Sequence, residues 1–185
     1  MDLTTDYQDI HREIIELSKA GNSRAQYQLY QLYSKAMYNI CYRMMNNREE
    51  AEDMLQESFT DAFMKLQTFR YESSFGSWIK KIVINKCINE LKRRKVELLY
   101  TEQFPDKKHE DEPDNFETTG LKVKDVMRAM ENLPEGYRII FSLYLLEGYD
   151  HTEIAQIMGI TESTSKSQFS RAKQKIKELL KANVP

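Results

Sequence analysis

Apolar residues recur at helical spacing through most of this chain, and two such patterns follow one another between Glu52 and Lys95. In the first, apolar side chains lie three or four residues apart, the spacing of one buried helix face: Leu55, Phe59, Ala62, Phe63, Leu66 and Phe69. In the second, a step of about 100° per residue gathers the apolar side chains on one arc: Ile79, Val83, Ile84, Cys87, Ile88 and Leu91. The stretch predicts two amphipathic helices joined by a hinge.

The polar faces of these two helices differ in chemistry. The first helix carries an acidic, amide and hydroxyl stripe: Asp53, Gln56, Glu57, Thr60 and Asp61. The second carries an indole, ammonium groups and amides: Trp78, Lys81, Asn85, Asn89 and Lys92. Amides bond base edges, ammonium groups pair with phosphates, and an indole stacks on bases, so the second face is suited to nucleic acid.

The hinge, residues 69–78, reads FRYESSFGSW and interleaves aromatic with small polar residues. Such a loop can form a pocket for an unstacked base. Tyr71 and Phe75 are the predicted stacking residues, and Ser73 and Ser74 the predicted hydrogen-bonding partners of the base edge.

Two further helices are predicted before this stretch. The first carries Ile10, Ile14 and Leu17 and is broken by residues 21–23, where Ser23 is the predicted N-cap of the next helix. The second is expected to bury four aliphatic side chains: Leu29, Leu32, Ala36 and Ile40. Its tyrosines are interpreted as packing at the core rim. A turn at Asn46-Asn47 completes one predicted helical bundle, residues 1–96.

A second helical unit is predicted for residues 121–185. Its first helix has an apolar stripe of Val123, Val126, Met127 and Met130. Pro134 is expected in the first turn of the next helix, which is filled by Ile139, Ile140, Leu143, Tyr144 and Leu146.

The end of this unit has the pattern of a helix-turn-helix. Asp150 and Glu153 have capping-box spacing, and Gly159 permits a tight turn. The following helix is expected to bury Ser165, Phe169, Ala172, Ile176 and Leu179. Polar and basic residues lie off that stripe: Lys166, Ser167, Ser170, Arg171 and Lys173. The N-terminal half of this helix is predicted to enter a major groove.

Between the two units, residues 97–120 lose all periodicity. This segment contains Pro105, Pro113 and Gly120 among acidic residues, a composition that cannot bury a core. Two interpretations stay open: a solvated tether, or a negative shield over basic surfaces. The predicted fold class is all-α, with two small helical domains joined by an acidic flexible linker.

Charge is segregated along the chain, although its formal net value is only −2. Residues 80–95 hold seven basic residues against one acid, residues 97–120 two against eight, and residues 161–181 six against two. Two basic islands therefore flank an acidic strip, which indicates electrostatic attraction to a polyanion more clearly than the net charge does.

Composition excludes several classes of protein. The 2 Cys and 3 His have neither metal-ligand nor disulfide-framework spacing, so buried free thiols and no metal or cofactor are expected. No apolar run approaches the ~18 residues of a membrane span, and the acidic start MDLTTDYQDI lacks the pattern of a signal peptide. We expect a cytoplasmic protein without membrane insertion.

Two motifs carry a resemblance to a known family. AEDMLQESF, followed by FGSWIKKIVINKCINELKRRK, resembles region two of bacterial RNA polymerase sigma factors of the extracytoplasmic-function (ECF) type. The segment from Leu133 to Ile176 resembles region four of the same factors. Many relatives have Val and Arg where this chain has Ser165 and Gln168, which affects the expected base preference and not the fold.

The resemblance implies a non-enzymatic initiation factor that binds core RNA polymerase and recognises and melts promoter DNA. By position it implies core-polymerase contacts at Asp53, Gln56, Glu57 and Phe59. It implies minus-ten contacts at Arg70, Tyr71, Ser73, Ser74, Phe75, Trp78, Lys81, Asn85, Asn89 and Lys92. It implies minus-thirty-five contacts at Thr164, Lys166, Ser167, Ser170, Arg171 and Lys173. Many relatives also bind an anti-sigma factor, a partner that the resemblance admits without identifying it.

Two other classes of protein were weighed against this one. A stand-alone helix-turn-helix regulator explains residues 121–185 and leaves the aromatic hinge without a use. A nucleic-acid hydrolase would need a Gly-rich phosphate loop, a metal cluster or a nucleophile–base pair, and the sequence has none of these patterns.

Overall fold

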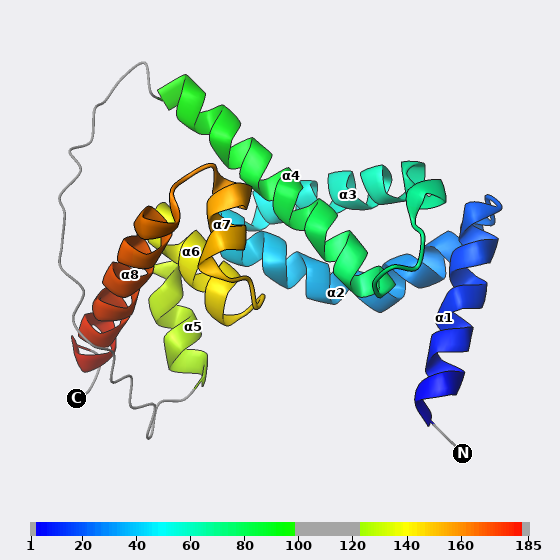
Figure 1. Ribbon diagram of the computed structural model, residues 1–185, viewed down its shortest axis with the longest axis horizontal. Helices are drawn as coiled ribbons and strands as arrows, with labels where there is room; N and C mark the ends of the chain where they lie inside the picture. Colours follow the sequence, from blue (N-terminus) through cyan, green and yellow to red (C-terminus); the bar gives the residue numbers. More distant parts are fainter. Residues whose placement is uncertain (1–2, 99–122, 183–185) are drawn as a thin grey trace. The chain divides into compact units, whose positions relative to one another are not determined.

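The computed structural model describes residues 3–98 and 123–182, and those residues contain helices and no strand (Figure 1). Their order is α1 (Leu3–Lys19), α2 (Ser23–Met45), α3 (Arg48–Met64), the 3₁₀ turn η1 (Leu66–Thr68), α4 (Phe75–Leu98), α5 (Val123–Glu131), α6 (Glu135–Leu145), α7 (His151–Met158) and α8 (Glu162–Ala182). The predicted all-α class is confirmed. Apart from its first two residues, which end α4, the predicted linker at 97–120 lies outside the described residues.

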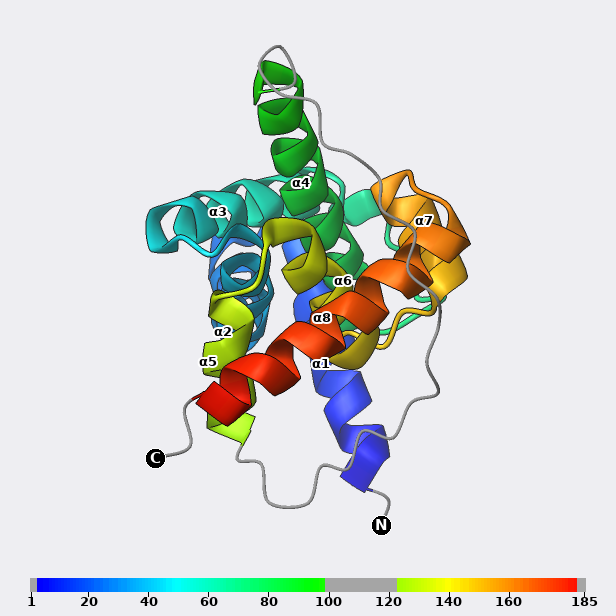
Figure 2. The ribbon, with the colours of Figure 1, turned by 90° about the vertical axis from the view of Figure 1, so that its left-hand side faces the viewer.

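The chain divides into two compact units, with the division between Leu91 and Lys92. In the first unit α2 packs along α3 and α1, and η1 contacts both α1 and α3 (Figures 1 and 2). Both predicted apolar faces of α3 and α4 are confirmed. Phe63 is half-buried, and the remaining members of the two faces are all buried. The hinge therefore joins two helices whose apolar faces share one core.

The core face of α2 differs from the prediction. Leu32 is 49% exposed and Ala36 is also exposed. Tyr30 and Tyr33 are half-buried at the rim of the core, as predicted: Tyr30 packs edge-on against Phe59 at 4.8 Å between ring centroids, and Tyr33 against Phe75 at 5.0 Å. The prediction for Leu32 and Ala36 was wrong because these larger aromatic side chains, together with the buried methionines and Cys41, turn a neighbouring face of the helix inward.

The N-cap of α2 and the buried face of α1 also differ from the prediction. The N-cap of α2 is Asn22 instead of Ser23, because the Asn22 side chain accepts a hydrogen bond from the Ala25 N–H at 3.1 Å. Among the α1 side chains that the structure describes, residues 11–19, Ile15 and Ser18 are buried, Ile14 is half-buried and Leu17 is 43% exposed, while the predicted Ile10 side chain lies outside them. The predicted turn at Asn46-Asn47 is confirmed: Asn46 is left-handed (φ 54°) and Asn47 caps α3.

The two cysteines are free and buried, as expected. Cys41 on α2 and Cys87 on α4 lie beside each other, and the neighbouring Cys41 thiol, together with burial, raises the pKa of Cys87. A raised pKa keeps the thiol protonated, so the pair behaves as an apolar part of the core.

In the second unit α8 packs against α5, α6 and α7. The capping box between Asp150 and Glu153 is confirmed, and Gly159 ends α7 in the left-handed conformation (φ 73°). Several apolar positions are less buried than predicted: Val123 is 76%, Tyr144 37% and Leu146 44% exposed, while Leu180 is buried and Leu179 only half-buried. Val123 and Leu146 lie at helix ends, where fewer neighbouring elements can cover a side chain.

The contrast between two leucines of α2 tests this arrangement. Leu29 is fully buried, so Leu29→Ala should lower the free energy of unfolding by about 2–5 kcal/mol. Leu32→Ala removes the same atoms from a half-exposed site and should cost about 0.5 kcal/mol or less. Trp78, the single tryptophan, reports unfolding of this unit by fluorescence in denaturant titrations. Equal losses in the two variants would contradict the observed face of α2.

Candidate functional site

The hinge between η1 and α4 forms a pocket of about 500 Å³. The residues that line it are Thr68, Phe69, Arg70, Glu72, Ser73, Trp78 and Lys81. Four of these, Arg70, Ser73, Trp78 and Lys81, were predicted site residues. The pocket combines two cations, a carboxylate, two hydroxyls and an indole, which are the groups that hold phosphates, base edges and base faces.

Three pocket residues were missed by sequence reasoning. Thr68 belonged to no predicted pattern, Phe69 was assigned to the apolar face and the hinge without a binding role, and Glu72 received no role although it lies within the hinge. A signal for Glu72 existed, because a carboxylate inside a basic and aromatic loop is a suitable acceptor for a base amino group.

Aromatic contacts form the floor of the pocket. Phe69 lies 5.3 Å from Trp78 and 5.7 Å from Phe75 between ring centroids, and Phe75 lies 5.6 Å from Trp78. Phe75 is only 4% exposed, so its ring belongs to the core and supports the other two. Trp78 is half-buried and keeps part of its surface at the pocket. Of these rings, Trp78 is therefore the one placed to stack on a base.

The two hinge serines have different environments. The Ser74 hydroxyl accepts a hydrogen bond from the Ser77 N–H at 3.2 Å and bonds the Ser77 hydroxyl at 2.9 Å, so Ser74 caps the start of α4. Ser73 is exposed and lines the pocket. A substitution at Ser74 would therefore disturb α4 itself.

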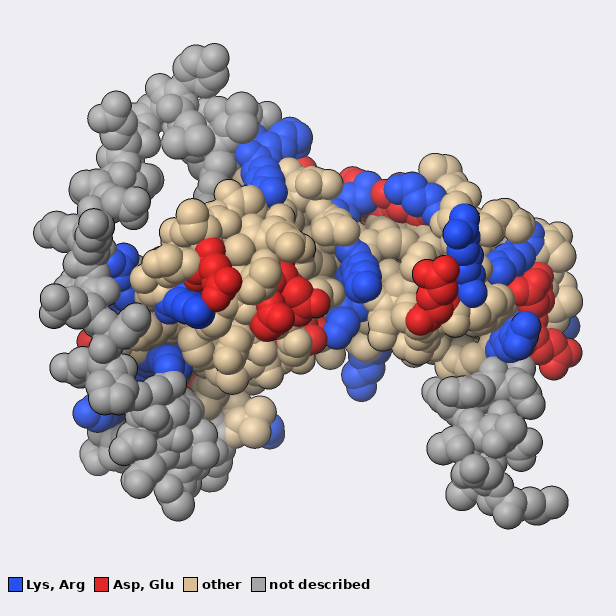
Figure 3. Space-filling view, in the orientation of Figure 1, with Lys and Arg blue, Asp and Glu red and all other residues tan. Residues whose placement is uncertain are grey.

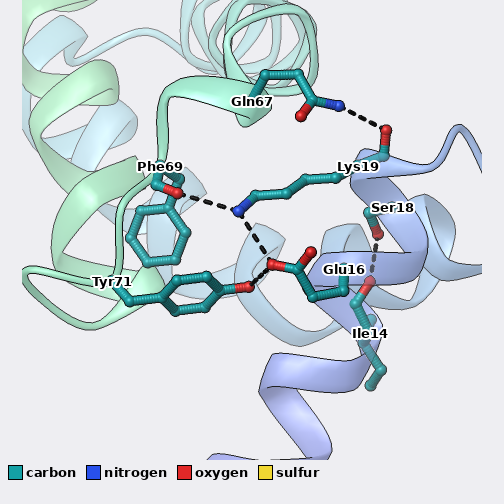
Figure 4. A network of polar contacts seen from close by, with 7 residues as sticks. All are labelled: Ile14, Glu16, Ser18, Lys19, Gln67, Phe69 and Tyr71. Atoms are coloured by element: carbon teal, nitrogen blue, oxygen red, sulfur yellow. Dashed lines mark hydrogen bonds and ion pairs between the residues drawn. The ribbon is translucent and has the colours of Figure 1, made fainter.

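Tyr71 turns away from the pocket and contacts α1 (Figure 4). Its hydroxyl donates a hydrogen bond to the Glu16 carboxylate, and the Lys19 ammonium lies 4.5 Å from its ring centroid. Burial and this hydrogen bond raise the pKa of Tyr71 to about 12, and the same hydrogen bond lowers the pKa of Glu16. The Tyr71 backbone is left-handed (φ 61°), which costs an aromatic residue roughly 1–3 kcal/mol and must be offset by such contacts.

The polar face of α4 continues from the pocket. Lys81, Asn85, Asn89 and Lys92 are all exposed, at the positions predicted. The side chains of Asn85 and Asn89 make no hydrogen bond to any residue in the described ranges, 3–98 and 123–182. In Figure 3 basic side chains follow the course of α4 (blue). This face provides amides and cations in one line along the helix, an arrangement suited to binding a single strand of nucleic acid.

The acidic stripe of α3 is partly engaged inside the protein. Glu57 and Asp61 both pair with Lys86 of α4, at 3.2 and 2.9 Å. The hydrogen bond that the Lys86 ammonium donates to Asp61 is the largest cause of a raised Lys86 pKa. Asp53 and Gln56 are exposed, and the Asp53 carboxylate has no ion-pair partner among the residues that the structure describes. Phe59 is 3% exposed and anchors α3 from beneath.

In the second unit the predicted residues lie on the first half of α8. The Thr161 hydroxyl caps the helix by accepting a hydrogen bond from the Thr164 N–H at 3.1 Å. Lys166 is exposed and pairs with Glu162 at 2.7 Å, and the Ser167 hydroxyl donates to the Ser163 carbonyl. The other three predicted residues, Ser170, Arg171 and Lys173, are half-buried.

Ser165 has a structural explanation. It is fully buried, and its hydroxyl bonds Nδ1 of His151 at 2.9 Å. The His151 ring stacks on Tyr144 at 4.5 Å, and burial, followed by the nearby Lys166 charge, lowers the His151 pKa. A neutral imidazole can exchange one hydrogen bond with a buried hydroxyl, so this pair joins α7 to α8.

Within residues 3–98 and 123–182, no cluster of His, Cys, Asp and Glu has the composition of a metal site. Over the same residues, every helix is too short or too polar to span a bilayer.

Two family models match the chain. The model described as Sigma-70 region 2 matches residues 29–96, which contain the acidic stripe, the pocket and the polar face of α4. The model described as Sigma-70, region 4 matches residues 124–176, which contain the helix-turn-helix.

Similar proteins extend the likeness over nearly the whole chain. The ECF RNA polymerase sigma factor SigW of Bacillus subtilis (strain 168) is 24% identical over 90% of this chain and 95% of its own length. The ECF RNA polymerase sigma factor SigM of Mycobacterium tuberculosis (strain ATCC 25618 / H37Rv) is 28% identical over 91% of this chain and 83% of its own.

Two solved structures have a similar fold. One is the sigma factor RpoE in complex with the anti-sigma factor NepR from Bartonella quintana, with a TM-score of 0.55, 24% identity, and 85% and 97% of the two chains covered. The other is CnrH in complex with the cytosolic domain of CnrY, with a TM-score of 0.54, 21% identity, and 94% and 98% covered.

Proposed function

The chain belongs to the sigma-70 family, in the ECF group of RNA polymerase sigma factors, and we propose that its two units divide promoter recognition between them. It is a transcription initiation factor that directs core RNA polymerase to promoters. In the proposal, residues 1–96 bind polymerase and open the minus-ten element, residues 97–120 connect the units, and residues 121–185 grip the minus-thirty-five element.

The observation that carries the proposal is the hinge pocket. It faces the first turns of α4, whose exposed lysines and asparagines continue from its rim. A base displaced from the promoter would stack on Trp78 with its edge near Ser73 and Glu72, while Arg70 and Lys81 neutralise the adjacent phosphates. The flanking strand would follow Asn85, Asn89 and Lys92.

The proposed role is non-catalytic, because the chain supplies binding and strand separation while polymerase performs the chemistry. Its place of work is the cytoplasm, where polymerase and promoter DNA meet. One of the two similar structures is a complex with an anti-sigma factor, which supports such a factor as a third partner.

Polymerase binding should depend on Asp53. Asp53→Lys should weaken binding to core polymerase by about 2–5 kcal/mol, because it places like charges face to face across the proposed interface. Glu57→Lys would also set a lysine beside Lys86, so the single Asp53 variant is the cleaner test. Glu52→Lys is the control: it reverses an exposed charge on the same helix, and the like-charge contact that it creates with Arg48 lies at the surface, where both side chains are exposed to solvent. Co-purification at moderate salt measures the effect, and equal behaviour of the two variants would refute the assignment.

Promoter opening should depend on the Trp78 ring. Trp78→Ala should remove about 1–3 kcal/mol of base stacking, whereas Trp78→Phe should keep much of it. Permanganate reactivity of thymines around the start site measures open complexes, and closed complexes should persist in both variants. A pre-melted promoter bubble should restore transcription by Trp78→Ala. Wild-type thymine reactivity in this variant would show that the pocket is not used.

Upstream binding should separate phosphate from base contacts on α8. Lys166→Ala should weaken binding to all sequences alike and reduce the salt slope by about one, whereas Arg171→Ala should also relax preference at one base position. Lys175→Ala is the control, because Lys175 is an exposed lysine in a similar ion pair farther along α8. Transcription from intact minus-thirty-five elements that is unchanged in both test variants would contradict the proposal.

A further inference from the structure

A polar network connects helix α1 to the hinge, and no sequence motif predicts it (Figure 4). The Lys19 ammonium donates hydrogen bonds to the Glu16 carboxylate and to the Phe69 carbonyl, each at 3.1 Å. The Gln67 amide donates to the Lys19 carbonyl at 2.7 Å, and the Tyr71 hydroxyl donates to the same Glu16 oxygen that Lys19 contacts. Apart from the Lys19–Glu16 pair within α1, these contacts join residues 48 to 55 positions apart.

Lys19 is the centre of this network. Its side chain is only 14% exposed, an unusual degree of burial for a lysine, and its ammonium also lies 5.9 Å from the Phe69 ring centroid and 4.5 Å from that of Tyr71. A buried ammonium is stable only where its donors and its charge are satisfied. A carboxylate, a carbonyl and two aromatic faces satisfy them here.

The network holds the backbone on both sides of Arg70. Phe69 is fixed through its carbonyl, and Tyr71 through its hydroxyl and ring. With Tyr71 in the left-handed conformation, its ring lies on α1 while Arg70 and Glu72 line the pocket. Neither Glu16 nor Lys19 lines the pocket, so both would act on a bound base only through the hinge.

We propose that Lys19 and Glu16 are positioning residues for promoter opening: α1 holds the hinge in the conformation that keeps the pocket ready for an unstacked base of the melted strand. This inference rests on the proposed function of the pocket. It assigns to α1 a part in strand opening that is separate from polymerase binding, because the acidic stripe lies on α3.

The test uses polymerase reconstituted with full-length variants. Lys19→Met keeps the apolar stem and removes the ammonium, and should lower open-complex formation about tenfold to a hundredfold, the effect of losing hydrogen bonds made by a charged group. The affinity for core polymerase and the yield of closed complexes should stay within about twofold of wild type, because the proposed contacts for both lie outside the α1–hinge network. Tyr71→Phe removes only the hydroxyl and should give a smaller loss in the same direction. Glu13→Gln, an exposed substitution on α1, is the matched control and should have no effect.

A pre-melted bubble separates positioning from a general loss of structure. It should restore transcription by Lys19→Met, because the opening step is then already complete. Unchanged open complexes in both Lys19→Met and Tyr71→Phe, or a loss of core binding equal to the loss of opening, would overturn the inference. If Trp78→Ala lowers opening and these two variants do not, only the positioning role fails. If Trp78→Ala is also without effect, the proposed function of the pocket fails.

Discussion

The aromatic contact between Phe69 and the start of α4 is the constraint on which the first unit depends. Phe69 ends the apolar face that begins on α3, and Phe75 begins the face that continues along α4. Burying both rings in one core forces the chain between them to close into a short loop. Because Trp78 packs against both rings, the floor of the pocket is also the rim of the core. A change in core packing at this point would therefore alter the site.

Charge is arranged by the same packing. Lys86 projects from α4 toward α3 and takes up two of the acidic groups of the stripe, Glu57 and Asp61. These pairs join the two helices and leave Asp53 as the acid on that face without an ion pair inside the described part of the chain. On the neighbouring exposed face of α4, the Lys81 and Lys92 ammonium groups and the Asn85 and Asn89 amides face solvent. One helix thus separates an acidic surface suited to a protein partner from a basic surface suited to DNA.

The second unit depends on a different kind of contact. The helix-turn-helix is held by a capping box at α7, a left-handed glycine at the turn and the buried Ser165–His151 pair. A buried hydroxyl without a partner would be costly, so His151 makes the serine tolerable at a position that faces the core. The departure from the usual residue is therefore compensated locally, within the contact between α7 and α8.

The sequence by itself determined the helices, the two apolar faces around the hinge, the capping box, the turn at Gly159 and the position of the polar face of α4. Each of these follows from residues within a few turns of one another, where helical periodicity and capping chemistry act. Only the tertiary structure decided that Leu32 and Ala36 are exposed while Tyr30 and Tyr33 pack at the core rim, that Ser74 caps α4, and that Phe75 is buried. It alone placed Lys19 and Glu16 beside Tyr71, because a contact between residues about 50 positions apart depends on how helices pack, and the local pattern of neither segment records it.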